Sequence, residues 1–386
     1  MSAHVFVSRG FFPEAGQILG FELKFDDPPT LTLLPLPAVT QGGSFPLWMA
    51  TDAAKKFCYA TDGGGNAVHA YSLGEDGALT HLGKQSSGGG VPCHLSVVGK
   101  TVLVANYSGS NVASFLIAAD GSLGPATVHA HASGTGEAAP EASGRQEAAH
   151  PHMIEPGPAG APFAFVADLG TNSVVSYALD AQAATLRKAG ELRLHAGAGP
   201  RHLAFSAAAP FAYLLNELDN TVTALHYEAA AGAFRPVAGS ERVSLLPLET
   251  PHACEGGASE LVLSRDGRFA YATVRACKAA VFNVVSTLSL DTTSGACALL
   301  ETTPCGGNMP WGAALAGPDD ALLLVQNQHA RPHADLAKNG ADLAANGEGA
   351  GCIALFRRDA ATGKLSATGV AVEVPSAMGI TVVPRA

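Results

Sequence analysis

Residues 91–107, VPCHLSVVGKTVLVANY, contain the pattern that decides the fold. A proline turn opens one apolar strand, and a second apolar strand ends in a polar pair. The pattern returns in residues 150–169, HPHMIEPGPAGAPFAFVADL, and in residues 199–217, GPRHLAFSAAAPFAYLLNE. A unit of several short strands that recurs about every 40–50 residues is typical of the blades of a β-propeller. We therefore expect an all-β ring that brings the same position of every blade to one central mouth.

Seven blades are expected from the way the repeats and the chain ends combine. The repeats begin near Pro46, Pro92, Pro151, Pro200, Ala258 and Pro310, with a last, short one at Pro375. Residues 1–37 hold three strand-like runs, and residues 378–383, MGITVV, supply one more. Three strands plus one complete a four-stranded blade and cover edges that an open ring would expose. The prediction is one seven-bladed β-propeller domain over residues 1–386, and six blades plus a loose N-terminal hairpin are the alternative.

Two insertions lengthen the repeats beyond a minimal blade. Residues 130–149 are rich in Ala, Gly, Ser and Glu, and residues 328–351 include the run KNGAD. Such compositions bury little apolar surface, so both insertions are expected to be surface loops. The sequence shows no long amphipathic helical pattern.

The composition limits the classes of function. Apolar residues make up 47% of the chain and charged residues 15%, and the net charge is −10. This acidic balance argues against nucleic acid as a partner, although a local basic site for a small anion remains possible. Seven cysteines without a C-x-x-C pair, no signal-like N-terminus and no long uncharged apolar run indicate a cytoplasmic protein that does not bind a membrane.

Polar side chains lie where the first strand of each expected blade begins and where the second ends. Because these strands are antiparallel, both points lie at the same rim of the ring. His152 and Arg201 share one position on successive first strands, and Glu217 and Arg275 share the matching position on second strands. We expect these four residues to meet as catalytic residues. The further candidates for substrate binding are His94, Asn106, Asp168, His202, Glu260 and Trp311.

This combination suits an anionic substrate whose reaction involves an ester or lactone oxygen. Two guanidiniums can hold a carboxylate or phosphate and stabilise charge on a carbonyl oxygen. An imidazole transfers protons near neutral pH. Glu217 can orient His152 or act as the base itself, so the base stays open between the two. A structural ion pair of Glu217 with Arg201 or Arg275 is an equally open interpretation. The scattered loop histidines lack the spacing of metal ligands, so no metal site is expected.

A resemblance to a known family extends over most of the chain. Its pieces are residues 145–152 (RQEAAHPH), 166–170 (VADLG), 199–205 (GPRHLAF), 216–218 (NEL) and 258–268 (ASELVLSRDGR). In this order and spacing they resemble the seven-bladed lactonase family of 6-phosphogluconolactonases and carboxymuconate-lactonizing enzymes. The resemblance implies an enzyme without metal or organic cofactor in which His152, Glu217, Arg201 and Arg275 act on the substrate. Val274 and Ala276, on either side of Arg275, depart from the Asn-Arg-Gly-like end of the family pattern. Trp311 departs from a Pro-Arg-like start, and this change concerns the substrate more than the fold.

Three functions follow as hypotheses from the residues and the resemblance. The first is hydrolysis of a small anionic sugar lactone, 6-phosphogluconolactone to 6-phosphogluconate, as in the pentose phosphate pathway. The alternative is reversible lactonization of a carboxymuconate, a cycloisomerase reaction for which the same residues would serve. The third is a propeller without catalysis that acts as an interaction platform, because a fold does not fix a function.

Overall fold

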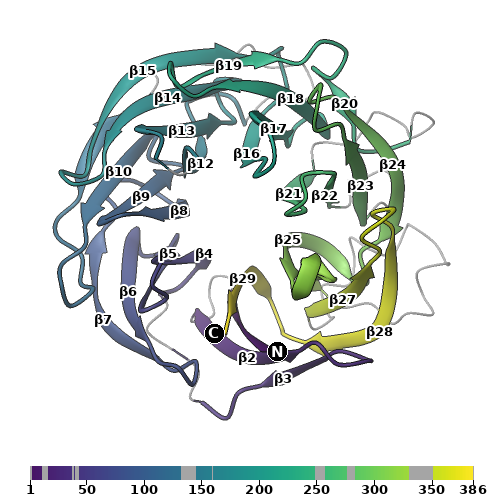
Figure 1. Cartoon of the computed structure of the whole chain (residues 1–386). Coiled ribbons are helices and arrows are strands. Elements are labelled where there is room, and N and C mark those ends of the chain that lie inside the picture. The colour runs from purple at the N-terminus through teal and green to yellow at the C-terminus, as the bar shows by residue number, and fades with distance from the viewer. Residues whose placement is uncertain are drawn as a thin grey trace.

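The computed structural model describes residues 2–10, 16–36, 39, 43–131, 145–158, 160–247, 257–275, 283–329 and 351–385. These residues form seven antiparallel sheets that stand as blades around a central opening (Figure 1). The predicted seven-bladed, all-β propeller is thus confirmed. Apart from the short 3-10 turn η2 (Pro318–Asp320), the described residues form strands, turns and loops, and no helix among them could span a membrane. Much of the two expected surface loops, residues 132–144 and 330–350, lies outside the described residues.

Every blade runs from an innermost strand at the opening to an outer strand at the rim of the ring (Figure 1). The innermost strands are β4 (Pro46–Thr51), β8 (Pro92–Val98), β12 (Pro151–Pro156), β16 (Pro200–Phe205), β21 (Ala258–Leu263), β25 (Asn308–Ala316) and β29 (Ala377–Pro384). The second strands are β5 (Phe57–Asp62), β9 (Thr101–Asn106), β13 (Phe163–Asp168), β17 (Phe211–Asn216), β22 (Phe269–Val274), β26 (Leu322–His329) and β1 (Ser2–Arg9). The third strands are β6 (Ala67–Leu73), β10 (Asn111–Leu116), β14 (Ser173–Asp180), β18 (Thr221–Glu228), β23 (Val284–Leu290), β27 (Cys352–Arg358) and β2 (Gln17–Lys24). The outer strands are β7 (Leu79–Ser86), β11 (Thr127–Ala130), β15 (Thr185–Arg193), β19 (Ala233–Pro236) with the added β20 (Val243–Ser244), β24 (Cys297–Pro304), β28 (Leu365–Glu373) and β3 (Thr30–Leu33).

The hydrophobic core lies between the blades and not inside any one of them. Second strands such as β9, TVLVAN, are buried at every position, because neighbouring blades cover both faces of each sheet. Outer strands such as β28 alternate between partly buried and exposed residues, because one of their faces meets solvent. One cluster, for example, packs Leu103 and Ala105 of β9 against Ile154 of β12 and Val166 of β13. Each sheet is therefore stabilised by both of its neighbours.

The two ends of the chain close the ring in one sheet, in the order β29-β1-β2-β3. Antiparallel pairing of β29 with β1 runs from Ala3 opposite Pro384 to Arg9 opposite Ala377. Figure 1 places both termini in this blade. The predicted closure is confirmed, and the alternative of six blades with a loose hairpin is wrong.

Candidate active site

The first strand of a blade begins with an irregularity that points side chains into the central opening. Pairing between β12 and β13 skips His152, and pairing between β16 and β17 skips Arg201. Cys93 and Trp311 are skipped in the same way at the starts of β8 and β25. A bulge of this kind leaves one residue without a ladder partner and turns its side chain out of the regular alternation. The repeated bulge therefore directs these side chains to one mouth.

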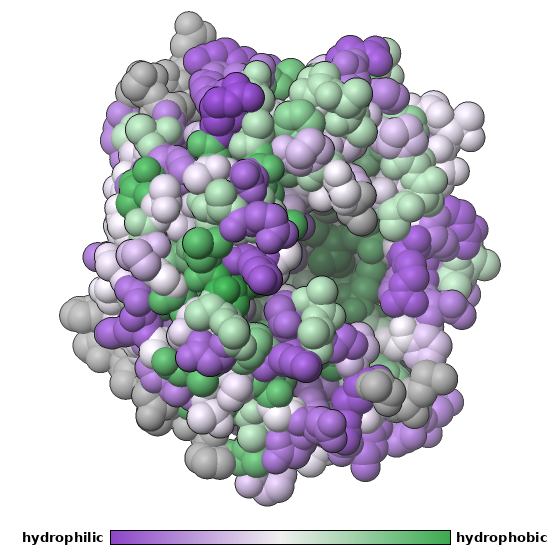
Figure 2. All heavy atoms as spheres, turned by 60° about the vertical axis from the view of Figure 1, so that its left-hand side comes forward, coloured by the Kyte–Doolittle hydropathy of each residue, from purple (hydrophilic) through white to green (hydrophobic). Residues whose placement is uncertain are grey.

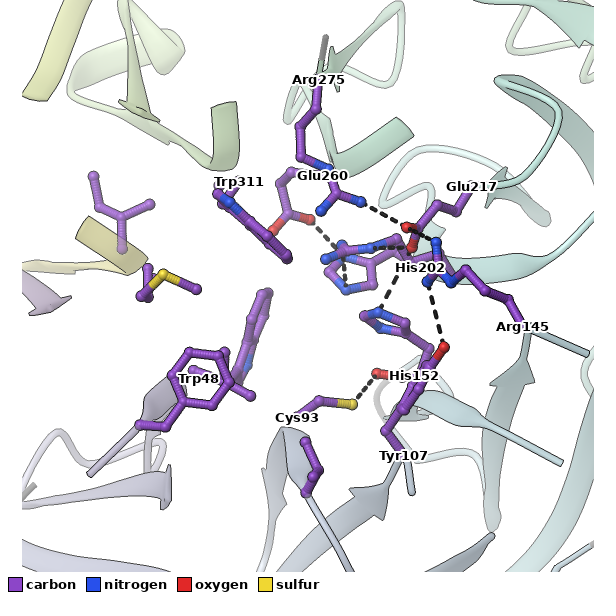
Figure 3. Close-up of a pocket in the computed structure, with 18 residues that line it drawn as sticks. Trp48, Cys93, Tyr107, Arg145, His152, His202, Glu217, Glu260, Arg275 and Trp311 are labelled. Atoms are coloured by element: carbon purple, nitrogen blue, oxygen red, sulfur yellow. Dashed lines mark hydrogen bonds and ion pairs between the residues drawn. The ribbon is translucent and has the colours of Figure 1, made fainter. Parts of the chain in front are cut away.

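A cavity of about 320 Å³ opens at this mouth. Figure 2 shows a hollow in the molecular surface whose depth is coloured hydrophobic and whose rim includes hydrophilic residues. Figure 3 shows Glu217 and Arg145 on one side of the cavity and Trp48 on the other, with Trp311 beside Arg275. The cavity thus has a charged wall and an apolar wall. The residues that line it are Phe45, Leu47, Trp48, Val91, Cys93, Tyr107, Arg145, His152, Arg201, His202, Glu217, Glu260, Arg275, Trp311, Gly312, Met378, Gly379 and Ile380.

Three guanidiniums surround the Glu217 carboxylate. Arg275 Nη2 and Arg145 Nη1 donate to its Oε1 at 2.7 and 2.9 Å, and Arg201 Nε donates to its Oε2 at 3.0 Å. Burial alone would raise the pKa of Glu217, but Arg275, Arg145 and Arg201 outweigh burial and lower it to about 2. Among the described residues, this cluster brings three positive charges to one negative charge. Such a site attracts an anion.

His152 is a neutral imidazole beside this cluster. Its Nε2 lies 3.8 Å from Glu217 Oε2, too far for a hydrogen bond, and its ring meets Tyr107 edge-on at 5.6 Å. Burial, together with the charge of Arg201, lowers the pKa of His152 well below its ordinary value. The imidazole therefore stays uncharged at neutral pH and can accept a proton.

A second chain of hydrogen bonds leads from Arg201 into the cavity wall. Arg201 Nη1 lies 3.0 Å from His202 Nε2, and His202 Nδ1 lies 2.8 Å from Glu260 Oε1. Arg201 also donates to the backbone oxygen of Ser259. Glu217 and Glu260 are thereby linked through one guanidinium and one imidazole, as Figure 3 shows.

Seven of the ten residues expected from the sequence line this cavity. Three do not: His94, Asn106 and Asp168. Asp168 is fully buried, and its Oδ1 accepts hydrogen bonds from the backbone N–H groups of residues 150, 170 and 171. Asn106 donates to the backbone oxygen of Ser87. His94 lies behind the wall, with its ring 4.4 Å from that of Trp48. These residues hold the loops and strands that carry the site.

Several lining residues were not among the expected site residues. Tyr107 follows Asn106 as Glu217 follows Asn216, and Trp48 shares the strand position of His202 and Glu260. Alignment of the repeats alone could have identified both. Arg145 lies in the loop before β12, outside the repeated strands, so no register signal marks it.

A reactive thiol and a cluster of metal ligands are two other groups that could give this site its chemistry. Cys93 lines the cavity, but burial raises the pKa of its thiol to about 12, so the thiol stays protonated at neutral pH. Its Sγ donates to the backbone oxygen of His152 at 3.2 Å. Within the described ranges, no group of three His, Cys, Asp or Glu side chains converges as metal ligands do.

Comparison with known proteins identifies the family. The model of the family "Lactonase, 7-bladed beta-propeller" matches residues 13–334, so the chain belongs to this family. The 6-phosphogluconolactonase of Bacillus subtilis is 31% identical over 336 residues, which are 86% of this chain and 85% of that protein. The 6-phosphogluconolactonase of Formosa agariphila is 27% identical over 75% of this chain and 73% of its own length.

A solved structure with the same fold covers the whole chain. The periplasmic gluconolactonase of Pseudomonas aeruginosa is 25% identical and superposes with a TM-score of 0.82 over 100% of both chains. The relatives and this structure thus share a fold and are named for lactones of sugar acids.

Proposed function

We propose that this protein hydrolyses an anionic sugar lactone, 6-phosphogluconolactone, to 6-phosphogluconate. The observation that carries the proposal is the cavity in which Arg145, Arg201 and Arg275 surround one carboxylate next to the neutral His152. The names of two relatives, the 6-phosphogluconolactonases of B. subtilis and F. agariphila, support the choice of substrate. The excess positive charge favours a phosphorylated lactone over an uncharged one.

His152 is the base in this proposal, and Glu217 holds the guanidiniums. With a pKa of about 2, Glu217 is a weak proton acceptor, and both of its oxygens already accept hydrogen bonds from arginine. His152 takes a proton from water as the water oxygen attacks the lactone carbonyl carbon. The guanidinium of Arg275 stabilises the negative charge that forms on the carbonyl oxygen.

Arg145 is the residue of the cluster best placed to bind the phosphate. Its side chain is 42% exposed, whereas the side chains of Arg201 and Arg275 are 5% and 9% exposed. A guanidinium at the mouth can meet the charged end of a substrate while the buried guanidiniums remain with Glu217. The Tyr107 hydroxyl, 3.3 Å from Arg145 Nη2, helps to hold this side chain in place.

A panel of three lactones tests the function: 6-phosphogluconolactone, unphosphorylated gluconolactone and a muconolactone. We expect the highest kcat/KM on the phosphorylated sugar lactone. His152→Ala should lower kcat by about 10²–10⁴-fold, the usual contribution of a proton-transferring group. Its thermal unfolding should stay close to that of the unaltered protein.

The outcomes separate the candidate functions. Preferred turnover of the muconolactone would replace the proposal by the cycloisomerase reaction. If none of the three lactones were turned over, a propeller that acts as an interaction platform would remain as the candidate function. Full activity of His152→Ala would remove the imidazole from the reaction. The cytoplasmic location expected from the sequence stays a prediction.

A further inference from the structure

The carboxyl group of Glu260 has one oxygen tied to protein and one that is not. Oε1 lies 2.8 Å from His202 Nδ1, and the backbone N–H of Leu261 donates to it at 2.9 Å. Among the described residues, no group hydrogen-bonds to Oε2. Glu260 lines the cavity, and only 5% of its surface is exposed. Its second oxygen is thus the one available to a bound molecule.

The hydrogen bonds of His202 fix which atoms donate. A guanidinium has only donors, so Arg201 Nη1 donates to His202 Nε2 at 3.0 Å. Nε2 must therefore be the acceptor nitrogen, and the ring proton lies on Nδ1. That proton is donated to Glu260 Oε1. Burial also lowers the pKa of His202 well below its ordinary value, which agrees with a neutral ring.

This arrangement leaves only one place for a proton on Glu260. Because Oε1 already accepts two N–H bonds, a proton on the carboxyl group is carried by Oε2. Burial raises the pKa of Glu260 to about 8, although the charge of Arg201 works against it. The charged and titratable groups that face this carboxyl group are Arg201 and His202 on β16 and Glu155 on β12.

We propose that Glu260 is the general acid of lactone hydrolysis, with its Oε2 proton passing to the ring oxygen as that oxygen leaves. This proposal rests on the proposed function. The two carboxyl groups at the ends of one hydrogen-bonded chain would then have different roles. Glu217 stays ionised and holds the arginines, and Glu260 carries the proton that is donated. Environments that push the protonation of two such groups apart are the usual basis of acid and base roles.

The step balances as follows. After water has attacked and His152 holds its proton, the tetrahedral intermediate collapses and the bond between the carbonyl carbon and the ring oxygen breaks. The bonding electron pair goes to the ring oxygen, which takes the Oε2 proton and becomes the hydroxyl group of the product. His152 then releases its proton to solvent, and solvent returns a proton to Glu260. The sum is lactone plus water giving the hydroxy acid.

Glu260→Gln tests the proposal, because the amide keeps an oxygen that accepts the bonds from His202 and Leu261 but has no acidic proton. The probes are 6-phosphogluconolactone and its thiolactone, in which sulfur replaces the ring oxygen. A thiolate leaves without a proton because thiols are far stronger acids than alcohols. We expect kcat on the lactone to fall by about 10²–10⁴-fold and kcat on the thiolactone to fall by less than about tenfold.

The pH profile on the ordinary lactone is a second readout. After subtraction of spontaneous hydrolysis, kcat/KM of the unaltered protein should fall as the pH rises through about 8, where Glu260 loses its proton. Glu260→Gln should lack this alkaline fall. The profile does not depend on the thiolactone, so it decides the matter even if that analogue is a poor substrate.

Glu191→Gln is the control. Glu191 lies on the outer strand β15, pairs with Lys188 and Arg193 and does not line the cavity, so its removal should spare kcat on both probes. Equal losses on lactone and thiolactone in Glu260→Gln, or an unchanged alkaline fall, would overturn the role of Glu260 while lactone hydrolysis stands. If the unaltered protein hydrolysed no lactone, the proposed function would fail first.

Discussion

The Glu217 side chain shows at the scale of one residue how a buried charge is stabilised. The glutamate residue is only 2% exposed, yet it is ionised because three guanidiniums donate to it. Removing the carboxylate from such a group takes away the negative charge that three guanidiniums share, which costs far more than the loss of a surface ion pair. Glu217 is therefore expected to matter for stability as well as for the site.

Glu217→Gln should lower the free energy of unfolding at pH 7 by about 3–5 kcal/mol. The pKa of Glu217 is lowered from its ordinary 4.5 to about 2. Its stabilising contribution is therefore complete above about pH 5 and is lost as the pH falls through 4.5 toward 2. Urea denaturation at pH 7 and at pH 3 should show a smaller difference between variant and unaltered protein at pH 3.

The exposed Glu75 provides the comparison for this measurement. Glu75→Gln should leave the midpoint nearly unchanged at both pH values. If the denaturation midpoint of Glu217→Gln equalled that of Glu75→Gln, the folded protein would be as stable without the carboxylate between the three guanidiniums as with it.

At the scale of one element, β29 both closes the ring and forms part of the cavity wall. It pairs with β1, and its residues Met378, Gly379 and Ile380 line the cavity. Gly379 lies where β29 passes close to β4 and β1. A Cβ atom there would stand 2.6 Å from the Leu47 backbone oxygen and 2.9 Å from Ser8 Oγ. The absence of a side chain allows this close approach.

Gly379→Ala should lower the free energy of unfolding by about 1–3 kcal/mol, because the added methyl group pushes β29 away from the β4 backbone. Chemical denaturation measures the change. Gly190 of β15 is the matched control, since a Cβ there meets nothing within 4 Å. If Gly379→Ala were as stable as Gly190→Ala, close packing at the closure would not limit stability.

At the scale of the whole molecule, the core consists of interfaces that follow one another round the ring. The Phe165 side chain, fully buried in β13, packs against Phe205, Tyr227 and Phe234, with ring centroids 5.5, 5.5 and 4.7 Å away. This cluster joins the sheet of β12–β15 to the sheet of β16–β19. Because every sheet has two such interfaces, loss of one is expected to weaken all the blades together.

Phe165→Ala should lower the free energy of unfolding by about 3–5 kcal/mol, because it leaves a cavity between two sheets. The two tryptophans of the chain, Trp48 and Trp311, lie in other sheets, so their fluorescence reports on distant blades. Fluorescence and far-UV circular dichroism should shift together in urea. Leu300→Ala, at a 49% exposed position, should barely move either signal.

Separate transitions for the two signals would contradict cooperative unfolding of the ring. A fluorescence midpoint that stayed in place while the dichroism midpoint fell would show that the interface around Phe165 unfolds independently.

The repeat pattern was enough to predict the blades, their starting points and the closure by both termini. It was enough because each blade uses the same short strands and turns, and these are local properties of the sequence. Equivalent positions also predicted that His152, Arg201, Glu217 and Arg275 would meet. The same reasoning failed for Asn106 and Asp168, because the polar residue at the end of these second strands serves the loop beside it.

The sequence by itself determined the ring and the register that brings four charged or titratable residues to one mouth. Only the tertiary structure decided the environment of each of them. Arg145 joins Glu217 from a loop outside the repeats, and the 3.8 Å between His152 and Glu217 excludes a direct hydrogen bond. Burial and neighbouring guanidiniums act differently on two carboxyl groups, because the pKa of Glu217 is lowered to about 2 and that of Glu260 is raised to about 8. Burial and distance arise only when distant blades pack, and the order of residues along one blade does not contain them.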